Sequence, residues 1–265
     1  MVDQSDDDAT QLALVSFGED SRFRYVRSGT RGVSLSRNVG IDSTSAPIVA
    51  FTDDDCRAPE DWVARIAEVF EATPDAAIVF GRVTVPSDVE GSRYAARFEP
   101  VAREYQNTFP GAGVAWGIGA NMAFRRSVFD DVGTFDPLLG PGAKFPAAEE
   151  YDLTIRALAA GLKVVNAKEV TVLHLGVRER EAASALVRGY GMAIGAALAK
   201  HVRLGTKDGR LLLASWIGYH GTVAMRNAVL RRRPTNLGFV GSILWGIVRS
   251  SLHSVDSARF VYREL

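Results

Sequence analysis

Short apolar runs alternate with helical patterns from the start of the chain to about residue 175. Uninterrupted apolar stretches at 48–52 and 77–80 are typical of buried strands. Between them, apolar residues of the segment 62–70 recur at helical spacing, and Pro59 suits the first turn of that helix. The alternation predicts an α/β fold with a mostly parallel sheet flanked by helices. Further strands are predicted at 23–26, 163–165 and 170–174, and further helices at 35–45, 126–132 and 148–160.

The remaining residues, 177–265, show helical periodicity only, so we divide the chain into an α/β unit, residues 1–176, and an all-helical C-terminal extension. Two uncharged segments, 211–225 and 234–248, fall short of the roughly 20 residues that a membrane-spanning helix needs. They can pack on the body, which is the simpler interpretation, or lie in a membrane interface. Helices of the extension are predicted at 182–196, 209–230, 236–250 and 254–263.

Charge is unevenly distributed along the chain, although 31 Lys plus Arg balance 31 Asp plus Glu. The first 175 residues hold 17 basic and 26 acidic residues, and the rest hold 14 and 5. We expect the acidic body to need cations and the basic tail to meet an anionic membrane surface. Arg231–Arg233 is either a solvated basic patch or a contact for phospholipid head groups. A single cysteine excludes an intramolecular disulfide and favours a reducing compartment. The acidic N-terminus has no apolar core and does not resemble a signal peptide, so we expect a cytoplasmic protein. The basic tail would hold it peripherally on the inner face of the membrane.

Three consecutive aspartates, Asp53, Asp54 and Asp55, directly follow the strand predicted at 48–52. Ligands gather at the carboxyl ends of strands in open α/β sheets. Crowded carboxylates repel one another unless a cation lies between them, and Mg²⁺ or Mn²⁺ prefers such oxygen ligands. The alternative is a solvated acidic turn that caps the helix starting near Pro59.

A second acidic group, Glu149, Glu150 and Asp152, opens the helix predicted at 148–160. These carboxylates can simply interact with the positive end of the helix. In the functional interpretation one of them is a general base, because a carboxylate beside another and near an apolar wall has a raised proton affinity. His174 ends the last strand of the α/β unit and is either a metal ligand or a core histidine.

Four segments follow one another along the chain: Val2–Ser5 with Asp7, Ser36–Ile41, Phe51–Asp55 and Gly119–Arg126. The last of them continues through the Gly133–Asp136 and Glu149–Leu153 stretches. In this order, across about 175 residues, the segments resemble glycosyltransferase family 2, the inverting nucleotide-sugar transferases with the Rossmann-like GT-A fold.

The resemblance implies a role for each matching residue. The nucleotide of the donor would be bound by Asp3, Arg37, Asp53 and Asp54. A divalent metal, Mg²⁺ or Mn²⁺, would be held by Asp55 and His174. Glu150 matches the catalytic base, with Glu149 as the second candidate. The acceptor would be bound by Trp116, Gly119, Asn121 and Asp152, together with the Gly-rich stretch 111–119.

The resemblance therefore implies transfer of a sugar from a nucleotide-sugar donor to a hydroxyl of a glycan or lipid-linked acceptor, with no nucleic acid as partner. The family usually opens with a further βα unit, so roughly 30 to 40 residues are expected to be absent before Met1. Two other interpretations stay open. The same aspartates could serve a metal-dependent nucleotidyltransferase or phosphohydrolase, or the chain could be a non-catalytic remnant.

Overall fold

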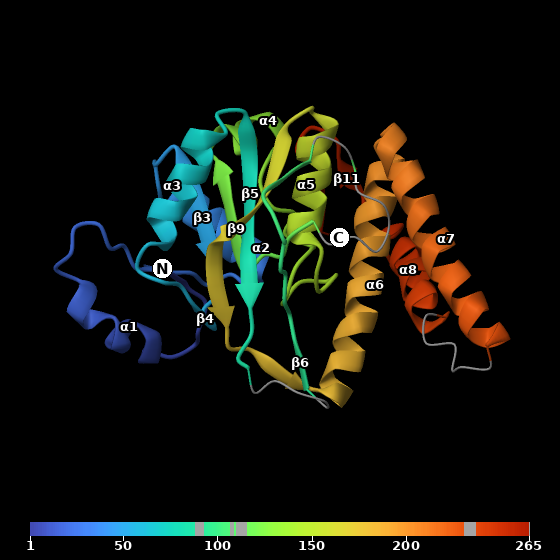
Figure 1. Cartoon of the computed structure of the whole chain (residues 1–265), viewed down its shortest axis with the longest axis horizontal. Coiled ribbons are helices and arrows are strands. Elements are labelled where there is room, and N and C mark those ends of the chain that lie inside the picture. Colours follow the sequence, from blue (N-terminus) through green and yellow to red (C-terminus); the bar gives the residue numbers. More distant parts are fainter. Residues whose placement is uncertain (88–92, 107–108, 110–115, 231–236, 265) are drawn as a thin grey trace.

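The computed structural model describes residues 1–87, 93–106, 109, 116–230 and 237–264. A six-stranded sheet lies at its centre, with the strand order β3-β8-β5-β9-β4 and with β7 also paired to β9 (Figure 1). The strands are β3 (Ile48–Thr52), β4 (Cys56–Arg57), β5 (Ala76–Thr84), β7 (Glu104–Gln106), β8 (Asn121–Arg125) and β9 (Lys163–His174).

The α/β architecture is confirmed, and its sheet is mixed. Its longest pairing, β5 with β9, is parallel, while β8 runs antiparallel to both β3 and β5. The two short strands β4 and β7 are also antiparallel to β9. A separate parallel pair joins β1 (Val2–Asp3) to β2 (Val26–Arg27). Sequence periodicity does not predict strand direction, because a buried strand shows the same apolar run in either orientation.

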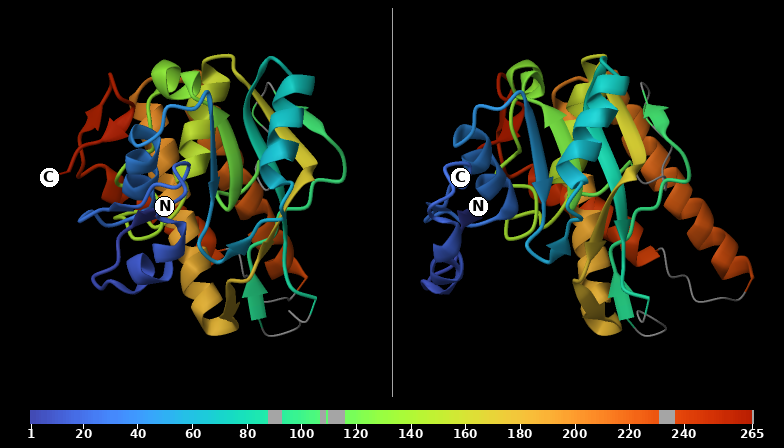
Figure 2. Two further views of the ribbon diagram at one scale, coloured as in Figure 1. Left: turned by 90° about the vertical axis from the view of Figure 1, so that its left-hand side faces the viewer. Right: turned by 60° about the vertical axis from the view of Figure 1, so that its left-hand side comes forward.

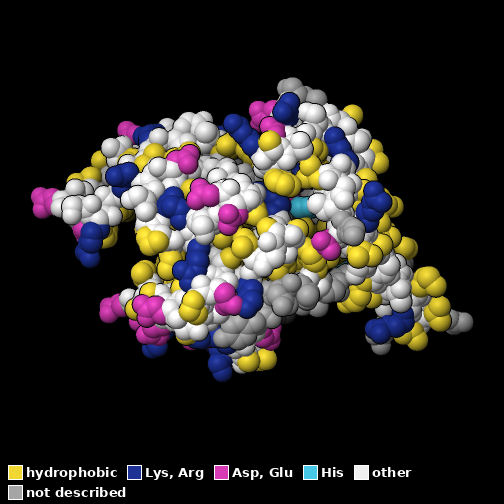
Figure 3. All heavy atoms as spheres, turned by 90° about the horizontal axis from the view of Figure 1, so that it is seen from above, with side chains coloured by type: hydrophobic (Ala, Val, Ile, Leu, Met, Phe, Trp, Pro, Cys, Tyr) yellow, Lys and Arg dark blue, Asp and Glu magenta, His cyan; other side chains and the backbone are white. Residues whose placement is uncertain are grey.

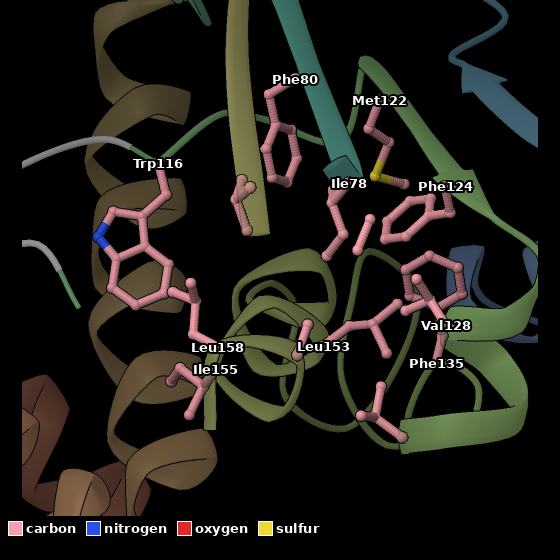
Figure 4. Packing of buried hydrophobic residues seen from close by; sticks show 14 of the residues in the cluster. Ile78, Phe80, Trp116, Met122, Phe124, Val128, Phe135, Leu153, Ile155 and Leu158 are labelled. Carbon is pink, nitrogen blue, oxygen red and sulfur yellow. The ribbon is translucent and has the colours of Figure 1, made fainter. Parts of the chain in front are cut away.

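Helices cover both faces of the sheet (Figure 2). One face packs on α3 (Trp62–Ala72) through Ile66, Val69 and Phe70, as the helical spacing predicts. The opposite face packs on α5 (Glu149–Ala159), and Figure 4 shows Ile78 and Phe80 of β5 on this side with Leu153. The remaining short helices of this part are α1 (Ala9–Ala13), η1 (Val15–Phe17), α2 (Val33–Asp42) and α4 (Ser127–Val132).

The C-terminal part contains three long helices, which lie beside the sheet on the right of Figure 1. Glycines let two of these helices approach closely, since a Cβ on Gly195 would overlap the backbone of Ile243 and one on Gly246 that of Met192. Among the residues that the structure describes, no helix is both long and apolar enough to cross a membrane. The helices are α6 (Arg180–Arg203), α7 (Lys207–Val229) and α8 (Leu237–Ser250).

The prediction of an all-helical extension is wrong in two places. Its first residues form β10 (Val177–Glu179), which pairs with β6 (Arg93–Ala95). The helix predicted at 254–263 is instead a hairpin of β11 (Val255–Asp256) and β12 (Val261–Tyr262). The Asp256 side chain accepts hydrogen bonds from the backbone of Ala258 and Arg259, which favours a turn over a helix. The boundary near residue 176 stays a prediction.

Candidate active site

Arg37 of α2 brings together residues from three other parts of the chain. Its Nη1 donates to Glu149 Oε1 at 2.6 Å, and its Nη2 donates to Asp53 Oδ1 at 3.1 Å and to the Gly119 carbonyl at 3.2 Å. Burial opposes the charge of Arg37, but Glu149 and Asp53 outweigh it and raise the guanidinium pKa. A Cβ on Gly119 would lie 2.8 Å from the guanidinium, so this position needs a glycine. Four predicted site residues therefore meet in one cluster, in which Arg37 and Glu149 are buried and Asp53 is partly exposed.

Glu150 lies next to this cluster at the start of α5. The residue before the helix, Ala148, has a left-handed φ of 68°, a strained conformation that sets the direction in which α5 begins. Desolvation, followed by the neighbouring charge of Glu149, raises the pKa of Glu150 to about 8. Its Oε2 atom is enclosed and has no hydrogen-bond partner among the described residues. Glu149, in contrast, is the counterion of Arg37.

Asp55 and His174, predicted as metal ligands, are brought together by the pairing of β4 with β9. Their closest atoms, Oδ1 and Nε2, are 3.4 Å apart. Cys56 lies opposite His174 in the register, and the candidate ligand atoms of the three residues lie within 4.8 Å of one another. A Cβ on Gly176 would overlap the Asp55 carboxylate, so a glycine leaves room for it. Cys56 was not predicted as a member of this group, although it directly follows Asp55 in the sequence.

The other aspartates of the predicted donor side differ in environment. Asp53 is partly enclosed, and desolvation raises its pKa despite the opposing effect of Arg37. Asp54 is exposed. Asp3 accepts a 2.6 Å hydrogen bond from the Tyr25 hydroxyl, and this bond, with others from Ser5, lowers the pKa of Asp3 to about 2. The contribution of Tyr25 was not predicted, because nothing in the sequence pairs it with Asp3.

Two of the predicted acceptor residues are buried structural residues. Asn121 accepts from the Trp62 indole at 3.0 Å and donates to the carbonyls of Arg82 and Val170 at 2.9 Å each. Trp116 is 4% exposed and packs between Phe109 and Tyr151, and the Tyr151 ring lies 5.0 Å from that of Trp116. Residues 110–115 of the predicted Gly-rich stretch lie outside the described residues.

Asp152, the third predicted acceptor residue, is fully buried in an ion-pair network. It lies 2.9 Å from Lys200 Nζ, 3.0 Å from Arg156 and 3.1 Å from His201. Burial opposes its ionisation, but Lys200 and Arg156 outweigh this and hold the Asp152 pKa well below its ordinary range. Lys200 also pairs with Asp136 at 2.6 Å. Asp152 thus ties α5 to α6, and its burial leaves it no surface for an acceptor.

A family model described as glycosyl transferase family 2 matches residues 1–133, half of the chain. The chain belongs to glycosyltransferase family 2. Among the relatives of the chain is the glucosyl-dolichyl phosphate glucuronosyltransferase of Haloferax volcanii, 29% identical over 179 residues, or 60% of this chain and 52% of that protein. The glycosyltransferase AglE of the same organism is 27% identical over 66% of this chain and 55% of its own length. The chain spans about half the length of these curated relatives.

Solved structures confirm the GT-A fold of this family 2 chain. The mannosyltransferase PcManGT from Pyrobaculum calidifontis, in complex with GDP-Man and Mn²⁺, superimposes with a TM-score of 0.56 at 14% identity. The match covers 94% of this chain and 76% of that one. TarS of S. aureus gives the same TM-score at 13% identity, over 93% and 70% of the two chains.

Proposed function

We propose that this chain transfers a sugar from a nucleotide-sugar donor to a hydroxyl of a glycan or lipid-linked acceptor, with inversion at the anomeric carbon. The observation that carries the proposal is the Arg37 cluster, which fixes the start of the Glu150 helix against the aspartates that follow β3. In the proposed reaction this cluster would hold the donor-binding edge and the general base in one place. Family membership and the names of the relatives support the same class of reaction.

On the donor side, Asp3 and Asp53 would bind the nucleoside, as the resemblance implies. Asp55 and His174 would hold a divalent metal, and the donor set fits one, because a carboxylate and an imidazole lie side by side. The imidazole favours Mn²⁺ over Mg²⁺, which prefers a shell of oxygen ligands. When bound, the metal supplies positive charge that stabilises the diphosphate leaving group.

On the acceptor side, Glu150 would remove the proton of the attacking hydroxyl. Glu149 is already paired with Arg37, whereas Glu150 has an oxygen with no partner among the described residues and a pKa near the working range of a general base. The acceptor oxygen forms a bond to the anomeric carbon as the bond to the diphosphate breaks, and the proton passes to Glu150. A single displacement of this kind inverts the anomeric centre and needs no covalent intermediate.

The test is calorimetric titration with UDP, GDP and dTDP, each with and without Mn²⁺. We expect metal-dependent binding of one nucleotide, lost in Asp55→Ala and kept in Glu150→Gln, while Glu150→Gln loses sugar transfer. Glu60→Ala, an exposed residue near the same turn, serves as control. Equal loss of binding in both site variants would contradict the roles assigned. Release of free phosphate from these nucleotides would instead favour a phosphohydrolase, and release of pyrophosphate from a nucleoside triphosphate would favour a nucleotidyltransferase.

A further inference from the structure

The helix α8 is apolar on two opposite sides, and only one of them is covered. Ile243, Gly246 and Ser250 are buried, with Gly246 against α6. On the other side, five large apolar residues recur at helical spacing and continue just past the helix end, with exposures between 48 and 66%. These residues, the outer face of α8, are Leu237, Leu244, Trp245, Val248 and Leu252.

The end of α7 adds to this apolar surface. Met225, Val229 and Leu230 are 71%, 80% and 57% exposed. Figure 3 shows hydrophobic side chains gathered on the side of the molecule that carries the helical tail. Large apolar side chains that are exposed together on two helices in contact indicate a partner that covers them.

The charges around the surface indicate the chemistry of that partner. Residues 209–255 contain six arginines and no aspartate or glutamate. Arg226 lies in the last turn of α7 and Arg249 in the last turn of α8. The triplet Arg231–Arg233, which joins the two helices in sequence, lies outside the described residues. Arginines without acidic neighbours favour phosphate head groups, and a tryptophan among aliphatic residues is typical of a membrane interface.

We propose that the outer face of α8, with the end of α7, binds the surface of an anionic lipid bilayer. The 14 residues of α8 extend about 21 Å, which is short of the roughly 30 Å hydrocarbon core, so the helix would lie in the plane of the interface. Its apolar side would enter the acyl boundary while the arginines contact the head groups.

The surface is physically connected to the helix that carries Glu150. A row of aromatic rings runs from Phe239 of α8 through His220 and Trp216 of α7 to Tyr151, with centroids 4.4, 5.4 and 6.0 Å apart. The Trp216 indole also donates to the Tyr151 hydroxyl at 2.8 Å, and Tyr151 directly follows Glu150. A bilayer on α8 would therefore sit at a fixed place relative to the base, which suits a lipid-linked acceptor. This last step rests on the proposed function, whereas membrane binding does not.

The test is sedimentation with phosphatidylcholine vesicles that contain or lack phosphatidylglycerol. We expect the full chain to bind the anionic vesicles, with weakening as salt is raised. The double variant Trp245→Ser/Val248→Ser should bind at least about tenfold more weakly, because two apolar anchors are lost. The control Val63→Ser/Val101→Ser changes two residues that are 68% and 81% exposed outside the tail, and it should bind like the parent. Circular dichroism confirms that both variants are folded.

Tryptophan fluorescence gives a second readout, since Trp245 is 56% exposed and the other three tryptophans are at least partly buried. Anionic vesicles should shift the emission to shorter wavelength, and Trp245→Phe should abolish the shift. Absence of vesicle binding, or equal binding by the double variant, would overturn the proposal. A dimer of the parent chain that the double variant abolishes, without vesicle binding, would assign the face to self-association. Nucleotide titration reports separately on the proposed function.

Discussion

Replacing Lys200 by methionine should destabilise the protein more than the loss of an exposed lysine would, because Lys200 pairs with buried carboxylates. Lys200 is fully buried and pairs with two carboxylates that are themselves fully buried, Asp136 and Asp152. Methionine fills a similar volume but leaves the Asp136 charge without a cation. Because Asp136 belongs to the segment before α5 and Lys200 to α6, the change weakens the contact between the tail and the body.

The magnitude follows from the partners that remain. Breaking a buried ion pair typically costs about 3–5 kcal/mol. Asp136 keeps hydrogen bonds from the backbone of Leu138 and Tyr262, and Asp152 keeps Arg156 and His201. We therefore expect Lys200→Met to lower the free energy of unfolding by about 3 kcal/mol, the lower end of this range. With an unfolding entropy of about 2.1 cal/mol/K per residue, this corresponds to a decrease in Tm of roughly 5 °C for this chain.

Urea unfolding followed by circular dichroism measures this free energy. The matched control is Lys163→Met, which removes an ion pair with Asp75 whose side chains are 41% and 58% exposed, and which should cost less than about 1 kcal/mol. In a double-mutant cycle, Lys200→Met/Asp136→Asn should cost less than the sum of the single variants by about 1 kcal/mol or more. Equal costs for Lys200→Met and the control, or strict additivity in the cycle, would refute the reasoning.

Two further predictions concern the candidate site. Transfer should slow as the pH falls below about 8, because protonated Glu150 cannot accept the acceptor proton, and a pH–rate profile of kcat/KM measures this. A profile that is flat from pH 6 to 9 would contradict a Glu150 base with a pKa near 8. Asn121→Ala should cost roughly 3 kcal/mol in urea unfolding, since three hydrogen bonds are lost and a buried carbonyl and indole remain unpaired. A loss below about 1 kcal/mol would show that these bonds are replaced by water.

The sequence predicted those parts of the molecule that depend on neighbouring residues. The pattern of apolar residues identified β3 and β5 as uninterrupted runs typical of buried strands, and α3 by apolar residues about 3.6 positions apart. It also placed Asp55 at a strand end and Glu150 at a helix start, where local geometry favours ligands and carboxylates. Asp55 and His174, which the family resemblance implies as metal ligands, lie 3.4 Å apart because β4 pairs with β9, and their metal binding stays a prediction.

The hairpin at the C-terminus shows where local reasoning fails. Residues 254–263 contain apolar residues at a spacing compatible with a helix. However, the Asp256 side chain accepts a hydrogen bond from the Ala258 backbone, and Phe260 adopts a φ of +57°. Contacts with distant residues then hold the hairpin in place. The backbone N–H of Tyr262 donates to Asp136, and the Tyr262 hydroxyl donates to the Ala196 carbonyl. Turn chemistry and tertiary contacts together outweigh a weak helical period.

The sequence by itself determined which polar residues surround the site, but only the tertiary structure decided which of them are free to act. Asn121 and Asp152 lie in segments that resemble the family, yet both are used internally, because their partners come from distant parts of the chain. Arg37 distinguishes the two adjacent glutamates in the same way: it pairs with Glu149, while one oxygen of Glu150 has no partner in the part of the chain that the structure describes. A sequence motif specifies side-chain chemistry, whereas the long-range partner determines whether that chemistry is already satisfied.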